Sequence, residues 1–264
     1  MKKKMNISFR IGFVITSLMV LMVLTGLIYT PYDPSEMNTS LKYAGISFEH
    51  IMGCDNLGRD IFSRVMQGSA TTLLVAVSTV LIGAVVGTVI GAFTGYYGGI
   101  VDSIFMRIND TIFAFPSILL ALVFIGIFGQ GTLNVIWALG IAFIPSFVRL
   151  IRAEVITLKE MDFVKSARLM GAGDLRLIFV HILPSTLKTL LSSVLIGFNN
   201  AVLAEAGMSF LGIGVQPPNA SLGRMLSEAQ SHMFVAPWYA LFPGIVIILM
   251  ILGFTLMGEG LDAS

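Results

Sequence analysis

The sequence predicts an all-α membrane protein with six transmembrane helices. Of its 264 residues, 56 % are hydrophobic and only 12 % are charged, and the mean hydropathy is +0.89. So few polar side chains cannot coat a water-soluble globule. Apolar runs of about 18 residues or more, the length that crosses a bilayer, recur with helical rather than alternating periodicity. The six predicted spans are residues 11–30, 70–95, 111–129, 132–150, 187–211 and 238–257.

The distribution of cations predicts how these spans are oriented. If the chain starts in the cytoplasm, twelve of its sixteen lysines and arginines lie on the cytoplasmic side, among them Lys2, Lys3 and Lys4. The positive-inside rule therefore predicts that both termini are cytoplasmic. The first apolar run is long and no small-residue cleavage site follows it, which predicts a retained helix rather than a signal peptide. The net charge of +1 argues against nucleic-acid partners.

Residues 1–69 are predicted to form the first transmembrane helix and an extracytoplasmic loop. The loop ends in a turn and an amphipathic lead-in to the second span, which by themselves predict a capped helix at the membrane interface. The single cysteine, Cys54, lies in this loop without an intrachain partner, so no disulfide is expected. Residues 70–258 are the predicted core, and residues 259–264 are a short C-terminal tail.

The second span carries a glycine at every fourth position, which makes three overlapping G-x-x-x-G steps on one helix face. Because lipid tails provide no hydrophobic drive between helices, such a face predicts close backbone approach of a neighbouring helix. That helix belongs either to this chain or to a partner subunit. The glycines of this helix-packing stripe are Gly83, Gly87, Gly91 and Gly95.

Prolines fall inside three of the predicted spans, at Pro116, Pro145 and Pro243. Each removes a backbone donor and can kink its helix. At Pro116 the preceding Phe115 places an aromatic ring beside the kink. The kink is therefore either purely structural or a hinge whose rings gate a pore.

The segment from 149 to 184 is polar and rich in cations, and it is predicted to be a docking loop made of two short helices. Residues 157–160, Thr-Leu-Lys-Glu, read as a capping box that opens the first helix. Gly171 and Gly173 supply the permissive backbone that ends it. Asp174 is predicted to cap a second helix that runs to Pro184.

The fifth span contains a carboxylate, Glu205, on a stripe of small residues, with Asn199 and Asn200 in the same span. A carboxylate that faced lipid would cost at least ~2.5 kcal/mol, so Glu205 is predicted to face protein or a water-filled cavity. Three roles stay open: a structural hydrogen-bonding post, a lining residue of a path through the membrane, or a direct contact with substrate or metal.

The sequence lacks the motifs expected for ATP binding, nucleophilic catalysis and metal binding. There is no Gly-Lys pair, so the chain has no phosphate loop for ATP. No nucleophile with a base and an orienting group stands at recognisable spacing. His50, His181 and His232 are far apart and make no metal-ligand cluster. We therefore expect a protein that is not an enzyme and that holds no cofactor or metal.

Two groups of motifs carry a family resemblance. In spacing, residues 165–184 resemble the cytoplasmic coupling loop of the permease subunits of ATP-binding-cassette importers, whose pattern is Glu-Ala-Ala, then Gly, then an aliphatic residue before Leu-Pro. Residues 55–60, Asp-Asn-Leu-Gly-Arg-Asp, resemble the Asp-x-x-Gly-Arg-Asp signature of dipeptide, oligopeptide and nickel permeases. Further matches in the same order are Gly-Tyr-Tyr-Gly-Gly at 95–99, Ala-Phe-Pro-Ser at 114–117, Glu-Ala-Gly-Met-Ser-Phe-Leu-Gly at 205–212 and Ala-Pro-Trp at 236–238.

The resemblance implies a type I importer permease in the bacterial inner membrane. It implies a second permease of the same fold, two ATPase subunits that supply the energy, and an extracytoplasmic solute-binding protein, all within membrane lipid. Dipeptides or oligopeptides are the expected cargo. Nickel or another chelated metal is an alternative, as are an ion-gradient-driven secondary transporter and a structural or assembly membrane protein.

The translocation path is predicted from the spans themselves, and the coupling residues from the resemblance. The translocation path is expected to include Phe115, Pro116, Asn200 and Glu205. The chain departs from the family pattern where Lys165 replaces the coupling-loop Glu and Ser166 replaces the following Ala, which puts any inherited salt bridge through that Glu in doubt. The expected ATPase-coupling residues are Lys165, Ser166, Ala167, Gly171, Asp174, Leu183 and Pro184.

Overall fold

The computed structural model describes residues 7–262, and within that range the chain is helical and forms no strand. The predicted cytoplasmic Lys2, Lys3 and Lys4 and the last two residues of the predicted tail lie outside the described residues. The elements are α1 (Ile7–Ile28), η1 (Thr39–Leu41), α2 (Ile61–Tyr97), α3 (Gly99–Phe113), α4 (Ser117–Phe128), α5 (Thr132–Leu158), α6 (Asp162–Leu169), α7 (Asp174–Arg176), η2 (Leu177–Ile182), α8 (Leu183–Phe210), α9 (Leu222–Ala229), η3 (Gln230–His232) and α10 (Pro237–Asp262).

The predicted all-α membrane fold is confirmed. Five helices of the described chain are long and apolar enough to cross a membrane, and the pair α3 and α4 makes a sixth span if it is counted as one. The helices run past the predicted apolar limits: α2 begins at Ile61 and α5 continues to Leu158. Hydropathy marks where polar residues begin, whereas a helix continues as long as one of its faces is packed. Pro145 and Pro243 lie inside α5 and α10, which continue through them.

The predicted span over residues 111–129 is broken at Pro116, where a kink was predicted, and the helix before the break, α3, begins earlier than predicted, at Gly99. α3 and α4 meet at 88° across the break before Ser117. Pro116 precedes α4 and disfavours helical geometry in the residue before it, so the chain turns there. α3 lies along α5 and is held by ion pairs: Arg152 donates to both Asp102 oxygens at 2.6 Å, and Arg149 lies 2.7 Å from Asp110. These pairs explain how a helix that carries charges packs in the bundle.

The glycine stripe of α2 faces α5 of the same chain. A Cβ added at Gly87 would lie 2.5 Å from the Cβ of Phe147, and one at Gly91 would lie 2.7 Å from the carbonyl oxygen of Val148. Gly83 and Gly95 approach α5 in the same way. The stripe thus lets the two backbones come into direct contact over much of their length.

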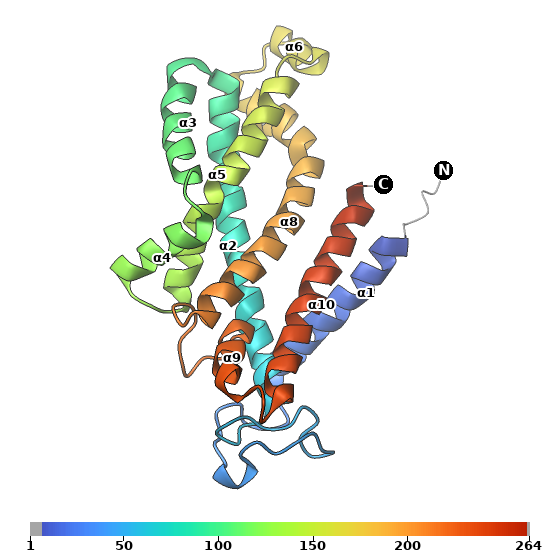
Figure 1. Ribbon diagram of the computed structural model, residues 1–264. Helices are drawn as coiled ribbons and strands as arrows, with labels where there is room; N and C mark the ends of the chain where they lie inside the picture. Colours follow the sequence, from blue (N-terminus) through green and yellow to red (C-terminus); the bar gives the residue numbers. More distant parts are fainter. Residues whose placement is uncertain (1–6, 263–264) are drawn as a thin grey trace.

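The first and last helices, α1 and α10, run side by side (Figure 1). Their backbones touch at small residues, because a Cβ added at Gly12 would lie 2.7 Å from the backbone nitrogen of Met257 and one at Gly253 would lie 2.7 Å from the Thr16 hydroxyl. Residues 29–60, here called the α1–α2 loop, close one end of the bundle, and α6 lies at the other end (Figure 1). We call these the loop end and the α6 end.

The α1–α2 loop is held to α9 and α10 by a buried charge cluster that the sequence did not predict. Arg59 and Arg64 each place a guanidinium nitrogen 3.0 Å from Glu228, and the Tyr239 hydroxyl donates to Glu228 at 2.8 Å. Both arginines also pair with the buried Asp55. Burial alone would raise the pKa of Glu228, but Arg64, the Tyr239 hydroxyl and Arg59 together hold that pKa below its ordinary value. The residues of the Asp-x-x-Gly-Arg-Asp motif therefore fasten the loop to the last helices.

The last residue of that motif, Asp60, caps α2. Its carboxylate accepts from the Ser63 amide at 2.8 Å and lies 2.9 Å from His50 Nδ1. A capped helix start was predicted here. Cys54 is buried beside these groups, and burial, with Asp60 and Asp55, raises the pKa of its thiol to about 11. The thiol is therefore unreactive at neutral pH.

Candidate functional site

The polar segment between α5 and α8 is shorter than the predicted loop of 149–184. Its first ten residues belong to α5, whose buried face continues through Ile151 and Val155. The predicted capping box is wrong: the Thr157 hydroxyl donates to the Ala153 carbonyl within the last turn of α5, and α6 begins later, at Asp162. Packing of the apolar face, rather than the local polar sequence, sets where α5 ends.

The predicted glycine elbow is present, but only one of its glycines needs special geometry. Gly171 has φ +88°, whereas Gly173 has the ordinary value of −74°. The Asp174 side chain does not cap a helix and instead accepts a hydrogen bond from Tyr96 at 2.6 Å. A second helix ending at Pro184 is also wrong. The chain runs through a π-helical stretch, η2, directly into α8, and Pro184 is the second residue of α8.

α6 is anchored to the ends of α2, α5 and η2. Val164 and Ala167 are buried in one apolar cluster with Ile151 and Val155 of α5 and Ile178 of η2. Polar contacts also hold this region to the end of α2. Arg168 donates to the Tyr96 hydroxyl at 3.0 Å, and Lys159 Nζ donates to the Gly95 carbonyl at the end of α2 at 2.9 Å.

The outer face of α6 is free. Lys165 is about half exposed and lies 3.7 Å from the more exposed Glu160, and Ser166 is exposed beside it. At the end of the helix, Leu169 is 90 % exposed and Met170 is 82 % exposed. Large apolar side chains held in water next to cations are typical of a protein-binding surface. We call residues 160–176 the α6 surface.

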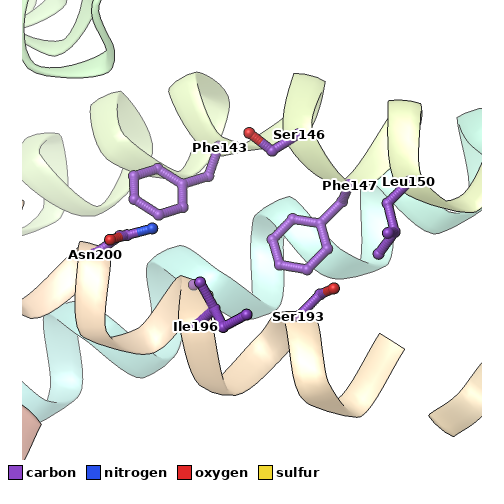
Figure 2. A pocket seen from close by; sticks show the side chains of 8 residues that line it. Phe143, Ser146, Phe147, Leu150, Ser193, Ile196 and Asn200 are labelled. Atoms are coloured by element: carbon purple, nitrogen blue, oxygen red, sulfur yellow. The ribbon is translucent and has the colours of Figure 1, made fainter. Parts of the chain in front are cut away.

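Two adjoining cavities, of about 200 and 330 Å³, lie along α5 and α8. They share Phe143, Ser146 and Asn200. In Figure 2 the ring of Phe143 on α5 and the amide of Asn200 on α8 approach each other across the first cavity. Both linings combine aromatic rings with hydroxyl and amide groups and contain no charged side chain. The other lining residues are Phe147, Leu150, Ser193, Ile196 and Gly197 in the first cavity, and Ser117, Ile118, Ala142, Leu203 and Ala204 in the second.

The four residues predicted to line a path through the membrane lie in different environments. Asn200 lines both cavities, and Pro116 directly precedes the lining residue Ser117. Phe115 is exposed in the break between α3 and α4. Glu205 is fully buried away from the two linings, where its carboxylate accepts from the Thr72 hydroxyl at 2.9 Å and from the Ser209 hydroxyl at 2.6 Å.

Glu205 joins three elements, because Thr72 on α2 also accepts from the Leu222 amide at the start of α9. This position favours the structural role for Glu205. Changing Glu205 to Leu should leave two buried hydroxyls without their acceptor, at a cost of about 1 to 3 kcal/mol, and should lower the melting temperature of the purified chain. Glu205→Gln keeps an acceptor and should melt close to the wild type. Equal melting of all three forms would contradict the structural role.

Sequence reasoning missed most of the cavity residues, although a signal for them exists. Positions 143, 146, 147 and 150 recur at spacings of three and four, as do 193, 196, 197 and 200. Such spacing places each set on one helix face. Nothing in the sequence, however, indicates that these two faces are opposed.

Comparison with known proteins gives one family. Residues 87–264 match the model of the binding-protein-dependent transport system inner membrane component. The chain is 45 % identical over 251 residues to the glutathione transport system permease protein GsiD of Salmonella typhimurium, covering 95 % of this chain and 82 % of that protein. It is 40 % identical over 232 residues to GsiD of Pectobacterium atrosepticum, covering 88 % and 77 %.

A solved structure shares the fold. The chain superposes on a chain of the inward-facing MetNI methionine ABC transporter with a TM-score of 0.63 at 18 % identity, covering 76 % of this chain and 95 % of that one.

Proposed function

The chain belongs to the binding-protein-dependent transport system inner membrane components, and on that basis we propose that it imports glutathione or a similar short peptide. It is a permease of an ATP-binding-cassette importer in the bacterial inner membrane. The observation that carries the cargo proposal is the 45 % identity to a glutathione permease along 95 % of the chain. The cavities also support it, since their hydroxyl and amide groups can pair with the peptide groups of a short peptide as it passes.

The proposed arrangement places the α6 end and both termini in the cytoplasm. A second permease would cover the open sides of the α5 and α8 cavities, two ATPase subunits would bind at the α6 surfaces, and a solute-binding protein would approach the loop end. Lys165 would then meet the ATPase where other family members present Glu. The positive-inside distribution of cations supports this orientation.

The packing of α6 suggests how ATP would act on the path. Val164 and Ala167 share a buried cluster with the end of α5 and with η2, which leads directly into α8. α5 and α8 line the first cavity and, together with α4, the second. When the ATPases close, a displacement of α6 would therefore reach both walls through packed side chains. Glu205 would hold α8 against α2 during this movement.

Uptake by cells that lack the chain tests the cargo. We expect loss of labelled glutathione uptake, restored by the wild-type chain and abolished when the partner ATPase cannot hydrolyse ATP. Loss of nickel uptake with normal glutathione uptake would instead support the metal alternative. Uptake that stops with an ionophore while ATP is kept normal would support a secondary transporter.

A further inference from the structure

A separate cavity of about 520 Å³ lies at the loop end, where α1 and α2 leave the apolar part of the bundle. The first predicted span ends at residue 30, which places Tyr29 and its neighbours at the expected boundary between lipid and water. Aromatic residues are enriched at this depth in membrane proteins. The lining residues are Tyr29, Pro31, Tyr32, Phe48, Glu49, Ile51, Asp60 and Phe62.

The chemistry of this lining favours a cation. It contains four aromatic rings and two carboxylates and no lysine or arginine. The faces of aromatic rings attract ammonium groups. Asp60 is already engaged by His50 and Ser63. Glu49 is exposed, and within residues 7–262 its carboxylate has no hydrogen bond or ion pair. Glu49 is therefore the carboxylate that is free to meet a ligand.

One wall of the cavity is fixed without a ligand. The Tyr32 hydroxyl donates to the Glu49 carbonyl at 3.0 Å, and the Tyr32 amide donates to the Ser63 hydroxyl at 3.1 Å. The Tyr32 ring also packs against the His50 ring at 4.6 Å. These contacts join residues from the α1–α2 loop to the first turn of α2, and they hold the backbone of Glu49 beside the rings.

We propose that this cavity binds the ammonium headgroup of an aminophospholipid such as phosphatidylethanolamine. Its volume lies in the range of about 300 to 1,000 Å³ that small ligands occupy. Its depth matches that of a headgroup whose acyl chains lie along α1, which presents exposed apolar side chains such as Leu24 and Leu27. The ammonium group would contact the aromatic rings and the Glu49 carboxylate. This assignment is independent of the cargo and of the ATPases.

Native mass spectrometry of the purified chain with equal amounts of phosphatidylethanolamine and phosphatidylglycerol tests the proposal. We expect preferential retention of the ethanolamine lipid, and Glu49→Gln or Phe48→Ala should each weaken that retention by about fivefold. Matched controls are Glu160→Gln, at the α6 end, and Phe234→Ala, which removes an equally exposed ring that does not line the cavity. Both controls should retain the lipid as the wild type does.

Three results would overturn the assignment. Equal retention of the two lipids by the wild type would show that the ammonium group is not recognised. Wild-type retention by both cavity variants would place the lipid elsewhere. Soluble phosphoethanolamine that binds as well as the lipid would identify a free amine as the ligand. Because Phe48 and Glu49 are exposed, both variants should fold, and unchanged melting temperatures would verify this.

Discussion

Gly171→Val is expected to abolish uptake by the assembled importer while leaving the chain in the membrane. Gly171 has φ +88° and no other atom lies within 4 Å of the position that a Cβ would take, so the penalty comes from the backbone alone. A left-handed conformation costs an ordinary L-residue roughly 1–2 kcal/mol, and a β-branched residue is a clear outlier there. The elbow would open and displace α6, the surface at which we propose that the ATPase binds. Uptake and ATP hydrolysis by equal amounts of assembled complex measure the effect.

Gly173→Val provides a matched control two residues away. Gly173 has φ −74° and ψ 162°, an extended geometry that suits Val, and it also has no neighbouring atom within 4 Å. This variant should transport nearly as the wild type does. Equal impairment of both variants, or normal uptake by Gly171→Val, would show that the left-handed elbow is not required for coupling.

Gly87→Val is expected to prevent stable folding of the chain. The added Cβ would lie 2.5 Å from the Phe147 Cβ and 3.0 Å from the carbonyl oxygen of Ile144, so the backbones of α2 and α5 would have to separate. Overpacking of this kind costs about 1–3 kcal/mol even where side chains can move aside, and here backbone atoms block the movement. A large fall in melting temperature and in the yield of detergent-soluble protein should result.

Gly126→Val is the corresponding control, because Gly126 lies inside α4 with no other atom within 4 Å of its Cβ position. It introduces the same β-branched side chain into another helix in the membrane. Its melting temperature should stay close to that of the wild type. If the two variants melted alike, the glycine stripe of α2 would not owe its importance to contact with α5.

The fold was largely predictable because the number of spans depends on composition and periodicity, which are local properties. Pro116 indicated the bend in the third span, but the sequence did not predict the extent of α3. Asp102 and Asp110 made α3 look too polar for a membrane helix, and their partners Arg152 and Arg149 stand some 40 to 50 residues later in the sequence. Hydropathy cannot indicate that a charge is neutralised by a distant residue. For the same reason, the sequence did not predict the ion pair between Arg64 and Glu228.

The candidate sites were predicted less completely than the fold. The spacing of residues 165–184 located the α6 surface, and the conformation of Gly171 agrees with the predicted elbow. The helix bounds around it were wrong, since tertiary packing extended α5 and joined η2 to α8. Cavity residues such as Ser146 and Asn200 became recognisable only once α5 and α8 were placed face to face.

The pairing of α1 with α10 has a consequence for how the protein is made. α1 is synthesised long before α10, yet much of its packing surface belongs to α10, and the charge cluster likewise joins Asp55 to Glu228 through Arg64. Until α10 is inserted, the small-residue face of α1 therefore remains exposed to lipid. Its docking must follow the synthesis of α10, so the newly inserted chain becomes a closed bundle only after α10 has entered the membrane.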